Sequence, residues 1–231
     1  MSKCIGILGG FSPESTARYY KHIVRGHRQR HRDHAYPEIA IYSVCAERYI
    51  ECIEIGEWAR VADGLLDGLC HLKRAGADFA VIASNMMDLV FERVRSSAPL
   101  PVISMMDTTL EAIEQAGCGK VGLLASRFTL EKSAYVDDVE RRGIHTVIPD
   151  QIDREELQRI ISEELSIGLV SAVSRERCLG VIEKLVRRGA QATVLACAEL
   201  PLLIRPADTN RPLFDSTILH SNKALTMATE Q

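Results

Sequence analysis

The sequence predicts an α/β protein made of two similar lobes, each built on a mainly parallel β-sheet. Short β-rich runs alternate with longer amphipathic runs, which is the pattern of βαβ units. Segments of the first half also return in the second half at a nearly constant offset, which indicates an internal duplication. With 231 residues, of which 46% are apolar and 26% charged, the chain has the composition of a soluble globular protein with sizeable buried cores.

The alternation predicts the elements one by one. The expected strands are Cys4–Leu8, Ile39–Val44, Phe79–Ala83, Val102–Met105, Lys120–Leu124, His145–Ile148, Thr193–Ala196 and Leu213–Phe214. The expected helices are Pro13–Arg28, Glu57–Arg74, Asp107–Ala116, Leu130–Arg142, Glu155–Leu165 and Ser174–Arg188. The first helix has a clear start, because Ser12 can cap it, Pro13 suits its first position and Glu14 complements its dipole.

Three pairs of segments carry the duplication. They are "CIGILGGF" and "KVGLLASR", "RAGADFAVIASN" and "RRGAQATVLACA", and "PVIS" and "PLFDST". The pairs begin at residues 4 and 120, 74 and 187, and 101 and 212, so their offsets are 116, 113 and 111 residues. Because the last copy lies near the C-terminus, we expect the chain to return to its first lobe. The expected lobes are residues 1–100 with 211–231, and residues 101–210.

The second pair of segments ends in two small reactive side chains, Ser84 and Cys197. Ligands of open parallel sheets bind beyond the carboxyl ends of the strands, and both residues are expected at such an end. If the lobes are related by a pseudo-twofold axis, both side chains reach one cleft from opposite sides. That arrangement suits removal of a proton from one face of a carbon and its return to the other face.

These residues resemble the cofactor-independent aspartate/glutamate racemase family along essentially the whole chain. The family opens with a segment like "GILGGFSPEST", its two catalytic cysteines lie in segments like "ACNTAH" and "GCTELPLLI", and its end is like "PLFDSTILH". Here the cysteine segments read "ASNMMD" and "ACAELPLLI". The sequence is most similar to bacterial L-aspartate/glutamate racemases, which carry threonine at the first catalytic position. The resemblance implies two Rossmann-like lobes with the active site in the cleft between them.

The resemblance also implies roles for individual residues. Cys197 and Ser84 match the two catalytic acid/base groups, and Asn85 matches the asparagine that holds the substrate carboxylate. Residues expected to contact the substrate are Gly10, Phe11, Arg48, Ile53, Met86, Ser166, Ala198 and Glu199, with Arg48 near an arginine that binds a distal carboxylate. Residues expected to support the site from behind are Asp88, Asp215 and His220.

Several positions depart from the family pattern in the same direction. Phe11 stands where methionine or glycine is common, Ile53 where a polar contact is expected, and Ala198 where threonine follows the second cysteine. Met86-Met87-Asp88 replaces Thr-Ala-His or Thr-Met-His, and Ser166 replaces a lysine. A buried carboxylate needs a partner, so these changes favour a substrate less polar than aspartate or glutamate. Arg48 argues for the acidic substrates.

The residue types suit proton transfer at carbon. A thiol is a serviceable base because N–H dipoles and positive charge can lower its pKa from about 8.5, whereas a serine hydroxyl is a much poorer base. The sequence therefore predicts an amino-acid racemase or epimerase in which Cys197 works much faster than Ser84. The alternatives are a single-cysteine decarboxylase or isomerase like the arylmalonate decarboxylases, a pathway-specific enzyme with altered chemistry, and a non-catalytic binding protein.

The remaining features set the expected surroundings. The net charge of −3 argues against nucleic-acid binding, and the basic stretch at residues 25–34 is expected to be a solvated helix end. No apolar run reaches the ~20 residues of a membrane span, and no secretory leader is recognisable. Seven irregularly spaced cysteines without a C-x-x-C pair favour the reducing cytoplasm. The resemblance implies a small amino or carboxylic acid as ligand, a homodimer, and no metal, nucleotide or pyridoxal cofactor.

Overall fold

The computed structural model describes residues 2–31, 35–131 and 135–230. Its contacts divide the chain into two units, Met1–Met105 with Thr217–Gln231 and Met106–Ser216. Each unit holds one four-stranded parallel sheet, in the order β2-β1-β3-β4 in the first and β6-β5-β7-β8 in the second. The predicted α/β class with parallel sheets is confirmed, and both sheets have the same strand order, as a duplication requires.

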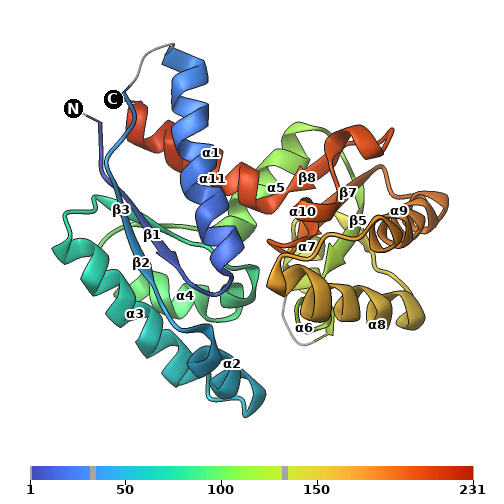
Figure 1. The fold of residues 1–231 in the computed structure, drawn as a ribbon, viewed down its shortest axis with the longest axis horizontal. Helices are drawn as coiled ribbons and strands as arrows, with labels where there is room; N and C mark the ends of the chain where they lie inside the picture. Colours follow the sequence, from blue (N-terminus) through green and yellow to red (C-terminus); the bar gives the residue numbers. More distant parts are fainter. Residues whose placement is uncertain (1, 32–34, 132–134, 231) are drawn as a thin grey trace. The chain divides into compact units, whose positions relative to one another are not determined.

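The first unit is a sheet covered on both faces by helices (Figure 1). Its strands are β1 (Ile5–Gly9), β2 (Ile39–Ser43), β3 (Phe79–Ile82) and β4 (Val102–Ile103). Its helices are α1 (Pro13–His31), α2 (Ala46–Glu54), α3 (Trp58–Arg74), α4 (Asp88–Ser97) and most of α11 (Ser216–Thr229). Successive strand residues point to opposite faces, so Ile7 packs against α1 and α11 while Leu8 packs against α3.

The C-terminal helix α11 completes the core of the first unit. It lies beside α1, where the blue and red helices of Figure 1 run together. His22 and Asn222 form a hydrogen bond of 3.0 Å between the two helices, and Arg30 donates to Thr226 at 3.1 Å. The chain therefore returns to its first unit, which is the crossing that the position of the last repeated segment suggested.

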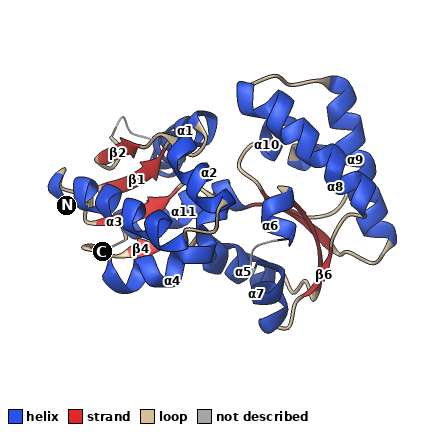
Figure 2. Ribbon diagram, turned by 90° about the horizontal axis from the view of Figure 1, so that it is seen from below, coloured by secondary structure: helices blue, strands red, loops and turns tan. Residues whose placement is uncertain are grey.

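The second unit repeats the same arrangement. Its strands are β5 (Lys120–Ala125), β6 (His145–Val147), β7 (Ala192–Ala196) and β8 (Leu213–Asp215). Its helices are α5 (Met105–Gln115), α6 (Arg127–Glu131), α7 (Tyr135–Arg141), α8 (Gln151–Arg159), α9 (Ala172–Arg187) and α10 (Leu200–Leu203). Helices α8 and α9 lie side by side (Figure 2), and Lys184 joins them through Asp153 at 2.7 Å. None of the helices in the described ranges is long and apolar enough to cross a membrane.

The boundaries differ in places from the expected ones. The chain crosses between units after residues 105 and 216, a few residues later than expected, because β4 pairs with β3 and β8 pairs with β7. Helix α8 begins at Gln151, capped by Asp150, and gives way to a π turn at Ile160–Glu164. The expected helix 130–142 is divided between α6 and α7, and its residues 132–134 lie outside the described ranges. Residues 25–31 of the basic stretch lie on α1, and residues 32–34 lie outside the described ranges.

Candidate active site

The loop after β1 is held close to the main chain of the neighbouring strand. Gly10 has a φ of +97°, and a Cβ built on it would lie 2.1 Å from the carbonyl oxygen of Val44. Only glycine fits such a left-handed and crowded position. The Gly10 N–H donates to Oγ1 of Thr16 at 2.9 Å, and this hydroxyl donates to the carbonyl of Ser12 at 3.0 Å. The first turn of α1 thus fixes the loop that carries Gly10 and Phe11.

Phe11 continues this loop as part of an apolar surface. Its ring meets the ring of Tyr49 edge to face, with centroids 5.1 Å apart and an interplanar angle of 84°. Tyr49 and Ile53 are one turn apart on α2, and Ile53 is buried. Phe11 and Ile53, which the sequence singled out as apolar departures, are therefore both held by local packing.

Strand β3 delivers Ser84 and Asn85 at its carboxyl end. All four residues of the strand are buried, so the chain is fixed up to Ala83. Ser84 is extended, with φ −158° and ψ 128°, and its hydroxyl makes no capping hydrogen bond to the 3-10 turn Asn85–Met87 that follows. Its side chain is available for another partner although the residue is buried.

The side-chain amide of Asn85 lacks the hydrogen bonds that a buried polar group normally makes. The residue is only 6% exposed, and neither Nδ2 nor Oδ1 has a hydrogen-bond partner among the described residues. An unsatisfied buried amide costs about 1–3 kcal/mol, so such groups are rare unless a ligand pairs with them. Nδ2 can donate to a carboxylate, which fits the role that the resemblance implies.

Strand β7 delivers Cys197 at the carboxyl end of the second sheet. The strand is fully buried, as are Cys197 and Ala198. The Cys197 thiol donates to Oε2 of Glu199 at 3.0 Å. Cys197 belongs to an apolar cluster that also contains Ile161, which lies in the π turn, and Leu165, the residue that follows this turn.

Burial raises the pKa of the Cys197 thiol well above its usual range, and the nearby Glu199 carboxylate raises that pKa further. The N–H groups of Glu199 and Leu200 point at the sulfur and act in the opposite direction. The thiol is therefore protonated at rest.

His220 supports the first unit from its interior. Tyr19 donates from its hydroxyl to Nδ1 of His220 at 2.8 Å, and Nε2 donates to the carbonyl of Ile103 at 3.0 Å. Burial lowers the pKa of His220 to about 4, so the ring is neutral at pH 7. These hydrogen bonds link α11 and α1 to the end of β4. His220 therefore stabilises the fold of the first unit.

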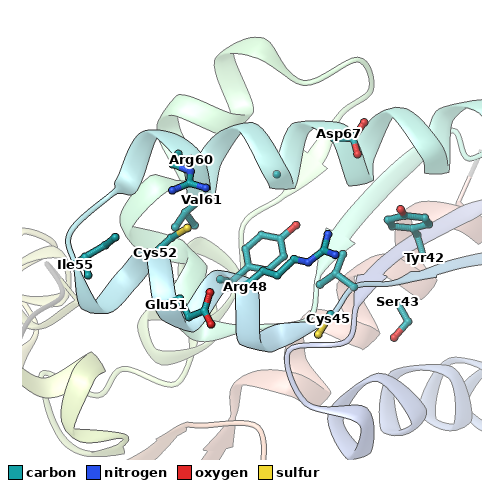
Figure 3. Close-up of a pocket in the computed structure, with 13 residues that line it drawn as sticks. Tyr42, Ser43, Cys45, Arg48, Glu51, Cys52, Ile55, Arg60, Val61 and Asp67 are labelled. Atoms are coloured by element: carbon teal, nitrogen blue, oxygen red, sulfur yellow. The ribbon is translucent and has the colours of Figure 1, made fainter.

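Arg48 lies on α2, the helix that follows β2. It lines a hollow of about 710 Å³ bounded by β2, α2 and α3, and the residues lining that hollow do not include Ser84, Asn85, Phe11 or Ile53. Figure 3 shows its side chain extending through the hollow toward Tyr42 and Cys45.

The other expected site residues lie as follows. Ser166 is exposed, and its hydroxyl donates to the carbonyl of Ser162 at 2.6 Å. Met86 is half-buried in the turn after Ser84, and Asp88 begins α4. Asp215 ends β8, the strand beside β7. In the ranges that the structure describes, no group of three or more His, Cys, Asp or Glu residues is placed to hold a metal ion.

Two residues that the sequence did not single out position this part of the chain. Thr16 holds the Gly10 N–H, and Tyr49 packs against Phe11. The signal for Thr16 is its place one turn after the Ser12 cap, where a hydroxyl can turn back to the loop. Tyr49 lies in α2, a helix that was not expected from the sequence.

The chain is similar to known proteins along nearly its whole length. The family model for Asp/Glu/hydantoin racemases matches residues 8–224. The chain is similar to the crystal structure of a candidate Asp/Glu racemase from Yersinia pestis, with 34% identity, a TM-score of 0.89 and coverage of 99% of this chain and 100% of that one. It is also similar to an aspartate racemase homologue from Pyrococcus horikoshii OT3, with 35% identity, a TM-score of 0.88 and full coverage of both chains. The Picrophilus torridus aspartate racemase shares its fold, with 23% identity, a TM-score of 0.80 and coverage of 99% and 95%.

Proposed function

The chain belongs to the Asp/Glu/hydantoin racemase family, and from this premise we propose that it is an amino-acid racemase or epimerase that needs no pyridoxal phosphate. Cys197 and Ser84 are its two acid/base groups and act on opposite faces of the substrate α-carbon. The observation that carries the proposal is the buried thiol of Cys197, hydrogen-bonded to Glu199 directly after β7. Ser84 takes the equivalent place after β3 in the other sheet.

The proton steps follow from the state of the thiol. Glu199 first accepts the Cys197 proton, and the thiolate then takes the α-proton of the substrate. The resulting carbanion receives the Ser84 proton on its opposite face, so the carbon loses one hydrogen to sulfur and gains one from oxygen. Ser84 then regains a proton from solvent and Glu199 releases one. A serine hydroxyl is a poor base, so removal of the α-proton by Ser84 is slow. Because the two enantiomers are equally stable, this step limits racemisation in both directions, while exchange through Cys197 alone is fast from one enantiomer.

Asn85 binds the substrate carboxylate in this proposal. Its Nδ2 is buried without a partner and follows the Ser84 position directly, so a carboxylate that accepts from it lies beside the reacting carbon. A hydrogen bond to a charged group is worth about 1.5–3 kcal/mol, and it withdraws the negative charge that develops when the α-proton leaves.

The substrate side chain is less polar than that of aspartate or glutamate. Three observations support this class: Phe11 packs on Tyr49, Ile53 is buried, and the hydroxyl of Ser166 is already bonded to Ser162. Arg48, the residue suited to a second carboxylate, lines the hollow bounded by β2, α2 and α3. A methyl- or methylene-sized difference in such a pocket changes substrate preference by about 1–3 kcal/mol.

Solvent deuterium exchange tests the proposal. D- and L-amino acids, apolar and acidic, are incubated with the enzyme in deuterated water and followed by NMR and optical rotation. We expect exchange at the α-carbon to be fast from one enantiomer and slow from the other, with loss of optical rotation. Equal exchange rates for both enantiomers, or no exchange with any amino acid, would refute the assignment.

Variants of Cys197 and Ser84 test the acid/base role proposed for each residue. Cys197→Ala is expected to abolish exchange from both enantiomers, and Ser84→Ala to keep exchange from the enantiomer that Cys197 attacks while stopping racemisation. Ser84→Cys is expected to accelerate exchange from the slow enantiomer and racemisation in both directions, because a thiol is the better base. A Ser84→Ala variant that racemises at the wild-type rate excludes Ser84 as an acid/base group.

A second candidate is a decarboxylase with one acid/base cysteine. The observation that favours it is the protonated resting state of Cys197, because decarboxylation of a malonate leaves an enediolate that needs only a proton donor. Carbon dioxide leaves and the thiol proton takes its place on the carbon. Release of bicarbonate from an α-substituted malonate, without exchange into any amino acid, distinguishes this function from racemisation.

A further inference from the structure

Two histidines lie one turn apart near the end of α1, beside a small cavity. His27 and His31, the α1 histidine pair, are four positions apart on the helix, so both side chains lie on the same face. Their rings stack with centroids 4.3 Å apart and an interplanar angle of 26°. His27 is buried and His31 is exposed. Both side chains line a cavity of about 210 Å³.

This cavity is formed by three segments of the first unit that are far apart in the sequence. Its lining, apart from the α1 histidine pair, consists of Ser2, Lys3, Ala228, Thr229 and Glu230. The Lys3 N–H donates to the carbonyl of Ala228 at 3.0 Å, which joins the start of the chain to α11. The end of α1, the end of α11 and the segment before β1 therefore surround the cavity.

Other histidines of the described ranges are in different surroundings. His22 is hydrogen-bonded to Asn222 at 3.0 Å, and His71 is stacked on Tyr42 with ring centroids 4.5 Å apart. Both ring nitrogens of His220 are hydrogen-bonded. Among the described residues, only the α1 histidine pair combines a spacing of four on one helix with a cavity.

We propose that the α1 histidine pair binds a divalent transition-metal ion such as Zn²⁺. Histidines four positions apart on a helix can present their imidazoles to one ion, and imidazole is a ligand that suits Zn²⁺, Ni²⁺ and Cu²⁺. A Zn–N bond is about 2.0–2.1 Å long, so two nitrogens that share a zinc ion are at most about 4 Å apart. The stacked rings are already near this separation. The exposed ring of His31 can rotate until its nitrogen and that of His27 face one ion.

Water molecules fill the remaining positions around the ion. In the part of the chain that the structure describes, no third His, Cys, Asp or Glu side chain is placed to complete a set of ligands. Glu230 lines the same cavity, where its carboxylate opposes the charge of the ion and of Lys3 and can accept a hydrogen bond from a metal-bound water. The ion links two turns of α1 and takes no part in the reaction proposed above.

A zinc titration of the full chain tests the proposal, followed by NMR of the histidine ring nitrogens and by calorimetry. The background is Cys45→Ser with Cys70→Ser, because both thiols are exposed and would bind zinc themselves. We expect the ring signals of His27 and His31 to shift together and to saturate with one ion per chain. No zinc binding, or shifts at other histidines without shifts at this pair, overturns the proposal.

Variants in the same background identify the ligands. His31→Gln is expected to weaken zinc binding by about tenfold or more, because one imidazole remains and the chelate is lost. His31→Asp, which supplies a carboxylate at the same position, is expected to bind zinc more tightly than His31→Gln. His71→Gln is the matched control, because it removes a partly exposed histidine from α3, and it should keep the original affinity. An unchanged affinity in His31→Gln overturns the assignment.

Discussion

The thiol of Cys197 donates a hydrogen bond to Oε2 of Glu199 over 3.0 Å. The carboxylate both accepts the thiol proton and opposes the thiolate charge, so it contributes to the raised pKa of Cys197. Removal of this charge is expected to lower the pKa of the thiol. In Glu199→Gln, Cys197 should react faster with iodoacetamide at pH 8 than in the wild type. Peptide mapping separates Cys197 from the exposed Cys45 and Cys70. Glu199→Asp is the charge-preserving control, and slower labelling in Glu199→Gln contradicts the expectation.

A second prediction concerns Gly10. Gly10→Ala places a methyl group 2.1 Å from the Val44 carbonyl oxygen in a left-handed conformation, and should lower the free energy of unfolding by about 3 kcal/mol or more. Gly56→Ala is the matched control, because Gly56 also has a positive φ of 75° but nothing lies within 4 Å of its added Cβ. It should cost about 1 kcal/mol. Urea denaturation measures both, and equal costs would show that the approach to Val44 is not tight.

A third prediction separates stability from function at Asn85. Since both amide atoms are buried without partners, Asn85→Leu should leave the free energy of unfolding unchanged or raise it by up to about 2 kcal/mol while abolishing turnover. Thr193→Val is the control, because Oγ1 of Thr193 is also buried without a partner but lies within β7. It should gain stability and keep activity. A clear loss of stability in Asn85→Leu would mean that the amide serves the fold.

A fourth prediction follows from the buried ring of His220. Its pKa is about 4 in the folded protein and about 6.5 in an unfolded chain, so only the unfolded chain binds the proton between these values. The free energy of unfolding should therefore fall as the pH is lowered from about 6.5 to about 4, by about 3 kcal/mol in total. His220→Gln should be less stable at pH 7 and should lack this part of the pH dependence. The measurement is the free energy of unfolding of the wild type and of His220→Gln, obtained by urea denaturation at several pH values across this range.

The sequence was sufficient where structure is decided locally. Apolar runs followed by Ser84 and Cys197 predicted two buried strands with these residues at their ends, and both strands have that form. The repeated segments predicted two sheets of equal topology, because each repeat contributes the same strand and turn. The Ser12 and Pro13 pattern placed the start of α1 correctly.

The features that the sequence did not predict depend on contacts between residues that are distant in the chain. Helix α2 was not predicted, although its less exposed residues Ala46, Tyr49 and Ile53 recur at helical spacing; no side chain caps its start. Helix α11 was missed because it buries serine, threonine and histidine, which satisfy their polar groups through partners such as Tyr19 and Ile103. The hollow that Arg48 lines is formed by β2, α2 and α3 together, and local patterns do not encode how these elements pack.

The return of α11 to the first unit sets an order for biosynthesis. Tyr19 and His220 are 201 positions apart, and all residues from Met106 to Ser216 are translated between them. On the ribosome, every residue of the second unit has been made before α11, whereas the core of the first unit is complete only once α11 has been made. A stall or truncation before Thr217 would leave Ile7, Tyr19 and Ile23 without the side chains of Ala224 and Leu225, and this apolar surface would be a target for chaperones.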